Sequence, residues 1–141
     1  MTERDRLRRP PRQVRIIGGR WKRTPLPVPD VAGLRPTPDR VRETLFNWLQ
    51  HLRPDLSALC GLDLFAGTGA LGFELASRGA RSVLLVESDP QALESLRATR
   101  ERLAATGVEV RPGDGLSLAT ALAPGSFDVI FLDPPFGSGL Q

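Results

Sequence analysis

The order of apolar and polar residues predicts a hairpin near the start of the chain. Residues 14–17 and 20–26 have the composition of two strands. Gly18-Gly19 lies between them and tolerates the positive φ that a tight turn requires. Three prolines toward the end of the second strand are expected to end the hairpin, because proline cannot donate to a strand ladder. Residues 30–36 then form a predicted loop.

A helix is predicted next. Thr37 can cap it, Pro38 suits the first helical position, and Pro54 closes it. Apolar residues recur within it at helical spacing and predict one buried stripe, consisting of Val41, Leu45, Trp48, Leu49 and Leu52. Arg42 and its neighbours Arg40 and Glu43 lie off that stripe, so we expect them to face solvent or a ligand.

From Gly61 onward, short apolar runs alternate with helical patterns. The predicted strands are 62–65, 82–86, 108–111 and 127–132, and the predicted helices are 70–78, 90–105 and 116–122. This alternation predicts an α/β fold with a parallel, Rossmann-like sheet and helices on both faces, preceded by the hairpin and the first helix. An open sheet of this kind needs strands on both sides of its first strand. We therefore expect the sheet to be truncated after strand four, with at least one further βα unit missing.

Charge is unevenly distributed along the chain. Residues 1–53 hold 13 basic and 5 acidic residues, whereas residues 54–141 hold 6 basic and 11 acidic. Positive charge concentrated at one end is expected where that end meets a polyanion, although a solvated basic tail has the same composition. On charge alone we therefore expect a basic flexible arm at 1–13, an extension at 14–53 that faces a polyanion, and a ligand-binding core at 54–141.

Other classes of function find little support in the composition. Cys60 is the only cysteine, so no internal disulfide can form, which fits a cytoplasmic location. No run approaches the ~20 apolar residues that cross a bilayer. His51 is the only histidine and no Cys/His cluster occurs, so we expect no metal. We expect a monomer that does not bind membranes.

A glycine-rich turn follows the first strand of the core. The segment Asp63–Gly72 reads DLFAGTGALG, in which Gly67 and Gly69 let a ligand approach the backbone closely. Its last six residues match the G-x-G-x-x-G pattern of dinucleotide binding. An acid at position 63 would repel a pyrophosphate but could meet the cationic end of S-adenosylmethionine, so this motif alone leaves both ligands open.

Two further acids follow strands. Glu87 ends the second strand, where a carboxylate can accept hydrogen bonds from both hydroxyls of a ribose. This position suits either cofactor and also an ordinary acid at a strand end. Asp114, within Gly113-Asp114-Gly115, could accept from an adenine amino group, and a plain turn is an equal interpretation.

The segment Asp133-Pro134-Pro135-Phe136 follows the fourth strand. Its two prolines remove N–H donors and stiffen the loop, which leaves the Asp133 carboxylate and the Pro134 carbonyl as acceptors. Rigid acceptors can hold both N–H groups of an exocyclic amine and free its lone pair for attack. Phe136 can stack on the base that carries the amine. The ordered set therefore favours methyl transfer to a planar amine.

Together these motifs look like a class I methyltransferase, and two longer segments make the resemblance specific. Arg15–Trp21 (RIIGGRW) and Leu34–Leu49 (LRPTPDRVRETLFNWL) resemble the RsmD family, the 16S ribosomal RNA guanine-N2 methyltransferases. The resemblance runs from about Val14 to Gly139. It implies methylation of guanine 966 in 16S ribosomal RNA of the small subunit, with S-adenosylmethionine as cofactor.

The resemblance also assigns residues. It implies that the cofactor is bound by Asp63, Gly67, Gly69, Glu87 and Asp114, to which we add Thr37, Phe65 and Ser88 as candidates. Basic residues of the hairpin and of the Arg-Pro-Thr block are expected to hold RNA phosphates, namely Arg15, Arg20, Lys22, Arg23, Arg35, Arg40 and Arg42. The alternatives are an adenine-N6 nucleic-acid methyltransferase, a methyltransferase for a protein glutamine amide, and a fragment that binds nucleotide or RNA without catalysis.

Overall fold

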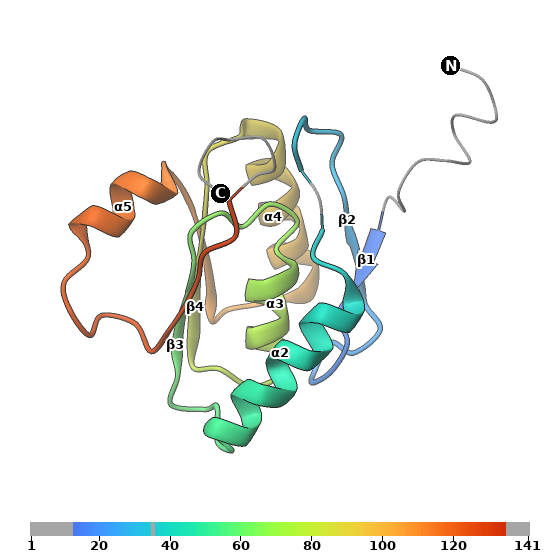
Figure 1. The fold of residues 1–141 in the computed structure, drawn as a ribbon. Coiled ribbons are helices and arrows are strands. Elements are labelled where there is room, and N and C mark those ends of the chain that lie inside the picture. Colours follow the sequence, from blue (N-terminus) through green and yellow to red (C-terminus); the bar gives the residue numbers. More distant parts are fainter. Residues whose placement is uncertain (1–12, 35, 135–141) are drawn as a thin grey trace.

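The computed structural model describes residues 13–34 and 36–134 and contains one hairpin, one parallel sheet and four helices within them (Figure 1). In chain order the elements are β1 (Gln13–Arg15), β2 (Pro25–Pro27), α2 (Asp39–Leu52), β3 (Cys60–Asp63), α3 (Ala70–Ser77), β4 (Ser82–Glu87), α4 (Pro90–Leu103), β5 (Val108–Pro112), α5 (Gly115–Ala121) and β6 (Val129–Phe131). Residues 1–12 of the predicted basic arm, Arg35, Pro135 and Phe136 lie outside the described residues, whereas Gln13, the last residue of that arm, begins β1.

The four strands of the sheet are parallel and run in the order β5-β4-β3-β6. This confirms the predicted Rossmann-like sheet, since the chain leaves β3 on one side and returns to its other side as β6. The order of strands therefore reverses beside β3. In open α/β sheets, ligands bind outside the carboxyl ends of the strands at such a switch point. Asp63 ends β3 there and pairs in register with Phe131 of β6.

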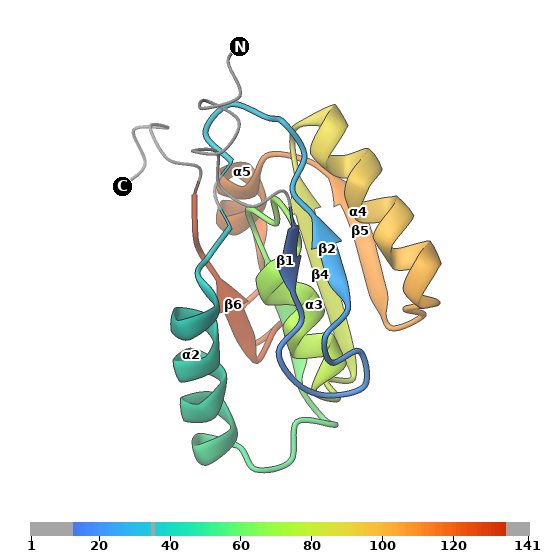
Figure 2. The same ribbon diagram turned by 90° about the vertical axis from the view of Figure 1, so that its right-hand side faces the viewer.

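Two apolar layers cover the sheet, as expected for a sheet with helices on both faces. α3, α4, α2 and the hairpin lie on one face, and α5 lies on the other (Figures 1 and 2). The larger core contains Val14 and Leu26 of the hairpin together with Phe46 of α2 and Phe73 of α3. The hairpin and α2 therefore share one core with the glycine turn and its helix.

The hairpin does not turn at Gly18-Gly19 as predicted. Its strands pair over three residues each, and the chain reverses through a longer loop closed by Ile16 and Thr24, whose N–H and carbonyl groups are 2.9 Å apart. The loop's backbone bonds instead to α3, because Gly18 N–H donates to Glu74 Oε2 (2.9 Å) and Trp21 N–H to Ser77 Oγ (2.9 Å). The prolines predicted to end the hairpin include two within β2.

Helix α2 begins one residue later than predicted and turns a different face inward. Pro38 is the N-cap, and Thr37 makes no capping bond. The predicted buried stripe is largely exposed, since Val41, Leu45, Trp48 and Leu52 expose 39–69% of their surface. Arg42 and Phe46 are buried instead, and Leu49 packs against the core. The prediction that Arg42 faces solvent or a ligand is therefore wrong.

Helix α4 begins at a predicted cap. Asp89, one of two predicted caps, accepts from Ala92 N–H (2.9 Å) at the start of α4. α4 ends at Leu103, followed by Ala104 at φ 51°, before the predicted stop at Gly107. No helix among the described residues is long and apolar enough to cross a membrane.

Candidate active site at the carboxyl ends of the strands

The glycine turn after β3 is held by a carboxylate from the next strand. Gly67 and Gly69 adopt φ values of 56° and 82°, which favour glycine. A Cβ on Gly67 would lie 2.7 Å from Leu34 Cδ1, so a side chain there would collide with the segment before α2. The N–H of Gly67 donates to Glu87 Oε1 (2.8 Å). The turn and the end of β4 therefore form one backbone cradle.

Glu87 has a second set of partners. Its Oε2 accepts from the N–H groups of Ser88 (3.0 Å) and Asp89 (2.9 Å). A carboxylate has about four acceptor sites, so Glu87 retains acceptor capacity beyond these three bonds. Ser88 itself is exposed beside it. The predicted role of Glu87 toward a ribose is compatible with this arrangement and stays a prediction.

Asp63 is 1% exposed, and one of its carboxylate oxygens, Oδ1, has no hydrogen-bond partner among the described residues. Burial is the main cause that raises its pKa to about 7. The N–H of Gly72 opposes this shift, whereas the nearby charges of Asp133 and Glu87 add to it. A buried carboxylate with one unsatisfied oxygen is costly in a folded protein, and such a group is a good candidate for contact with a cation.

Asp133 lies at the same edge of the sheet as Asp63. It follows β6, whose Phe131 carbonyl accepts from Leu64 N–H (3.2 Å), and its charge acts on Asp63. The side chain of Asp133 is exposed, and its Oδ2 accepts from the hydroxyl of Thr37 (3.0 Å). The chain thus places Asp133 at the edge of the sheet where Asp63 ends β3. Pro134 is half-buried beside them.

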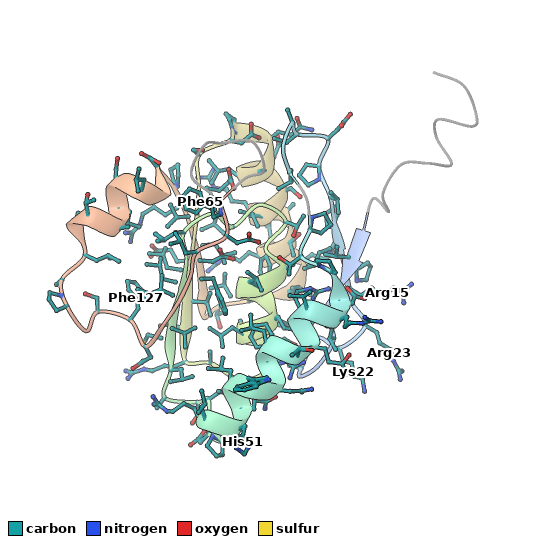
Figure 3. All side chains as sticks on the ribbon, viewed as in Figure 1. Arg15, Lys22, Arg23, His51, Phe65 and Phe127 are labelled. Atoms are coloured by element: carbon teal, nitrogen blue, oxygen red, sulfur yellow. The ribbon has the colours of Figure 1, made fainter. Side chains whose placement is uncertain are left out.

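The other predicted cofactor residues surround this edge. Phe65 lies in the turn and packs in the core under α5 (Figure 3). Asp114 caps α5, where its two oxygens accept from Leu116 N–H (3.3 Å) and Ser117 Oγ (2.8 Å). The hydroxyl of Ser117 is the main cause that lowers the pKa of Asp114. Asp114 is therefore an ordinary helix cap in this structure, and its role toward adenine stays a prediction.

The predicted RNA-binding residues fall into two groups. Arg15, Lys22 and Arg23 are exposed on the hairpin, on the side of the molecule away from α5 (Figure 3). Arg20 is exposed as well, with its guanidinium 5.6 Å from the ring centre of Trp21. Arg40 is exposed on α2.

Arg42 differs from this group, because its side chain is fully buried. It pairs with Glu74 of α3, Nη1 to Oε1 at 3.1 Å, and Glu74 is fully buried too. Its burial removes Arg42 from the set that can reach RNA phosphates. No signal in the sequence indicates this pair, because a buried arginine and an exposed one look alike in a helical pattern.

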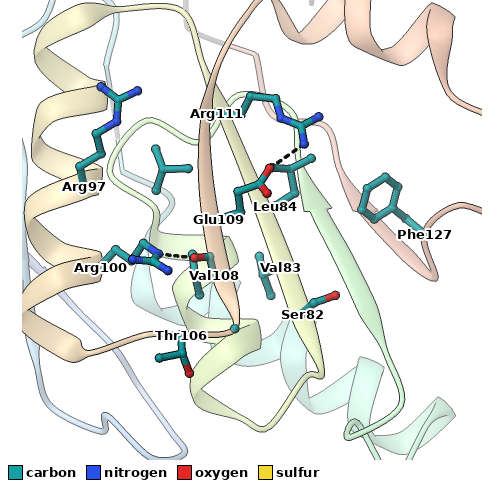
Figure 4. Close-up of a pocket in the computed structure, with 12 residues that line it drawn as sticks. Ser82, Val83, Leu84, Arg97, Arg100, Thr106, Val108, Glu109, Arg111 and Phe127 are labelled. Carbon is teal, nitrogen blue, oxygen red and sulfur yellow. Dashed lines mark hydrogen bonds and ion pairs between the residues drawn. The ribbon is translucent and has the colours of Figure 1, made fainter.

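A pocket of ≈ 620 Å³ lies elsewhere, along β4, β5 and α4 (Figure 4). It is lined in part by Arg97, Arg100 and Arg111, of which Arg100 bonds to the Val108 carbonyl and Arg111 to Glu109. None of the predicted site residues lines it. Within residues 13–34 and 36–134, no group of three or more His, Cys, Asp or Glu side chains could hold a metal ion.

A parallel α/β sheet with a glycine turn at its switch point and acids along the same edge defines a Rossmann-like fold of the class I methyltransferase type. The family model described as "Conserved hypothetical protein 95" matches residues 14–141. The chain belongs to that family, the RsmD family that the sequence resembles.

Individual relatives agree with this assignment. The chain is 48% identical over 129 residues to "Ribosomal RNA small subunit methyltransferase D" of Escherichia coli (strain K12), covering 91% of this chain and 63% of that protein. A protein of the same name from Haemophilus influenzae is 43% identical over 88% of this chain and 64% of its own length. The solved "Putative methyltransferase yhhF" of Escherichia coli has a TM-score of 0.77 at 45% identity, over 92% of this chain and 68% of that one. The chain thus spans less than two thirds of these curated relatives.

Proposed function

We propose that this protein transfers a methyl group from S-adenosylmethionine to the exocyclic N2 amine of a guanine in small-subunit ribosomal RNA. The observation that carries the proposal is the position of Asp133 beside the buried Asp63, whose Oδ1 has no hydrogen-bond partner among the described residues, at the switch point of the sheet. The names of the curated relatives support ribosomal RNA as substrate. The RsmD resemblance supports guanine N2, at position 966 of 16S ribosomal RNA.

The residues at this edge fit S-adenosylmethionine. The unpaired Oδ1 of Asp63 offers a buried negative partner for a cationic ligand, and the same charge would repel the pyrophosphate of a dinucleotide. Gly67 and Gly69 admit a ligand close to the backbone, and Glu87 retains acceptor sites for a ribose. Phe65, Ser88 and Asp114 complete the proposed cofactor set. When bound, the cofactor supplies a methyl group activated by its attachment to a sulfonium.

Asp133 is the residue proposed to act on the substrate. Its Oδ2 is already used by Thr37, so Oδ1 is left to accept an N–H of the guanine amine. The carbonyl of Pro134 accepts the second N–H, and Phe136 stacks on the base. These acceptors hold the amine nitrogen in line for attack, and positioning of this kind can contribute ~7–11 kcal/mol. Asp133 Oδ1 then takes the proton that the methylated nitrogen releases.

The basic hairpin is proposed to hold the RNA. Arg15, Arg20, Lys22 and Arg23 are exposed together on one side, and phosphate contacts of this kind position a nucleic acid without reading its sequence. Residues 14–53 then form an RNA-facing extension of the cofactor-binding core at 54–141. The target guanine leaves its stack at a cost of a few kcal/mol, less if it is already unpaired.

The proposal is tested by transfer of labelled methyl groups to small ribosomal subunits that lack this modification. Naked ribosomal RNA and duplex DNA serve as parallel substrates, and nucleoside analysis identifies the product. N2-methylguanosine formed on ribosomal RNA is the expected result. Methyladenosine as product, or binding of NAD with no binding of S-adenosylmethionine, contradicts the proposal.

Asp133→Ala tests the proposed acceptor. We expect it to lower kcat by about 100-fold, because the amine loses the group that orients it and accepts its proton. Binding of S-adenosylmethionine, measured by calorimetry, is expected to remain. Asp55→Ala, which removes an exposed carboxylate far along the chain, is the control. Transfer by Asp133→Ala at nearly the rate of the unmodified protein would remove Asp133 from the reaction.

A further inference from the structure

We infer that Thr37 is a positioning residue for Asp133, and that its own place is fixed by the buried pair Arg42–Glu74. The inference rests on the proposed function, since it concerns the carboxylate that is proposed to hold the substrate amine. It replaces the predicted contact of Thr37 with the cofactor. It also gives the segment between the hairpin and α2 a part in the reaction rather than in RNA binding alone.

The contact that carries the inference joins two distant parts of the chain. Thr37 Oγ1 donates to Asp133 Oδ2 at 3.0 Å, across 96 positions of sequence. Hydrogen bonds to an ionised acceptor are about twice as strong as neutral ones. A single donor on one oxygen fixes the rotation of the carboxylate and leaves the other oxygen free. Thr37 therefore fixes the orientation of the Asp133 carboxylate and so the direction in which its second oxygen can accept.

The backbone of Thr37 is itself held by the side chain of Arg42. Arg42 Nε donates to the Thr37 carbonyl at 3.2 Å, while Arg42 Nη1 bonds to Glu74 Oε1 at 3.1 Å. The remaining terminal nitrogen of Arg42 bonds to Asp39, in the first turn of the same helix. The planar guanidinium fixes these three directions relative to one another, which a lysine cannot do. Arg42 thus sets the distance between α3 and the Thr37 backbone.

Glu74 anchors this arrangement in the core. Besides Arg42 it accepts from Ile17 N–H (2.8 Å), Gly18 N–H (2.9 Å) and Arg78 Nε (2.9 Å). A buried charge with four donors has little freedom to move, because removing any one of them leaves a costly unpaired group. A continuous set of bonds therefore runs from the hairpin through Glu74, Arg42 and Thr37 to Asp133.

The test compares Thr37→Val, which removes the hydroxyl at nearly constant volume, with Thr37→Ser, which keeps it. We expect Thr37→Val to lower kcat by about 10-fold, with binding of S-adenosylmethionine changed by less than about twofold. Thr37→Ser is expected to restore most of the activity. Thr44→Val removes an exposed threonine hydroxyl from α2 and is the matched control.

A second measurement does not depend on methyl transfer. The NMR order parameter of the Asp133 side-chain methylene is expected to fall in Thr37→Val and to be retained in Thr37→Ser and Thr44→Val. If Thr37 contributed only to stability, Thr37→Val would lower the midpoint of unfolding. The order parameter of Asp133 would then stay the same, and the loss of activity would not be confined to kcat.

The outcomes separate the inference from the function on which it rests. If the unmodified protein transfers no methyl group, the proposed function fails, and the order parameter alone decides the inference. An unchanged order parameter in Thr37→Val overturns the inference. So does an activity loss that appears wholly as weaker binding of S-adenosylmethionine, because Thr37 would then be a cofactor ligand as the sequence predicted.

Discussion

At the scale of single residues, Asp63 combines burial with an unsatisfied oxygen. Burial, and to a smaller extent the neighbouring carboxylates, disfavour its charged form, so the folded chain holds this group at a cost in stability. Such a cost is common at sites that bind ligands, where a bound charge can offset it. The same property makes Asp63 measurable through the pH dependence of folding.

Asp63→Asn is expected to change how stability depends on pH. The folded pKa of Asp63 is about 7, above its ordinary value of 3.8, so the folded chain binds a proton that the unfolded chain releases. Stability due to this group is present below about pH 4 and is lost as pH rises through about 7. The loss is on the order of 4 kcal/mol. Asn cannot ionise, so the variant lacks this loss.

Urea unfolding at pH 5 and pH 8 measures the difference. The unmodified protein should lose more stability than Asp63→Asn between these two values, while the variant binds S-adenosylmethionine less tightly. Asp55→Asn changes a fully exposed carboxylate and is the control. Parallel stability profiles for the unmodified protein and Asp63→Asn would show that Asp63 does not titrate in this range.

At the scale of elements, helix α2 shows what the sequence could not predict. Its existence and length follow from periodicity and prolines, but its orientation does not. The buried face is set by Arg42 and Phe46, which lie four positions apart and so share one side of the helix. A prediction from periodicity counts arginine as polar. Phe46 is then a single apolar residue on its face, whereas the other faces carry several. The partners that make burial of Arg42 favourable, chiefly Glu74 on α3, do not show in the pattern.

Alanine substitutions on α2 are expected to separate its two faces. Phe46 is fully buried and packs 5.8 Å from the ring centre of Phe131, so Phe46→Ala should cost about 3–5 kcal/mol. Trp48 is 68% exposed, so Trp48→Ala should change stability by no more than about 0.5 kcal/mol. Chemical denaturation of the two variants at a common pH gives the comparison. A larger loss of stability for Trp48→Ala than for Phe46→Ala would show that the stripe predicted from the sequence is the buried face.

The sheet and its motifs, unlike the orientation of α2, could be predicted from local sequence. Its strands are short apolar runs bounded by glycine, proline and acids, and parallel strands fix where those acids meet. The edge that brings Asp63, Glu87 and Asp133 together follows from strand order alone. The turn of the hairpin was not predictable, because Gly18 bonds to Glu74 rather than to the opposite strand. Bonds across 56 positions leave no trace in local pattern.

At the scale of the whole molecule, charge and the candidate site are arranged together. The hairpin presents exposed basic residues, while the carboxyl edge of the sheet is acidic. A polyanion would be attracted to the hairpin and repelled by the acids. The phosphates of a bound nucleic acid would therefore lie at the hairpin, and one of its bases would lie at the acidic edge. The proposed modification of a single base within a folded RNA requires such a separation.

Lys22→Gln combined with Arg23→Gln is expected to weaken RNA binding. Both side chains are exposed on the hairpin loop, and each phosphate that they neutralise adds to the salt dependence of affinity. The slope of log K against log salt should fall by about 1 for each phosphate that is no longer neutralised. Filter binding of small-subunit ribosomal RNA at several salt concentrations measures this slope. Arg81→Gln combined with Arg97→Gln is the control, since it removes the same charge near the start of β4 and from α4. If this control weakens RNA binding equally, net charge explains the effect and the hairpin has no special role.

The four bonds to Glu74 have a consequence for how this domain can be rearranged. Three of its donors, Ile17, Gly18 and Arg42, come from the part of the chain before residue 54, and only Arg78 comes from the part after it. A protein shortened to begin at residue 54 would keep the acid and lose three of these four donors, among them one of the two arginines that pair with it. The segment at 14–53 is thus not a detachable module, and transplanting it onto a related scaffold would require a matching acid in the recipient helix.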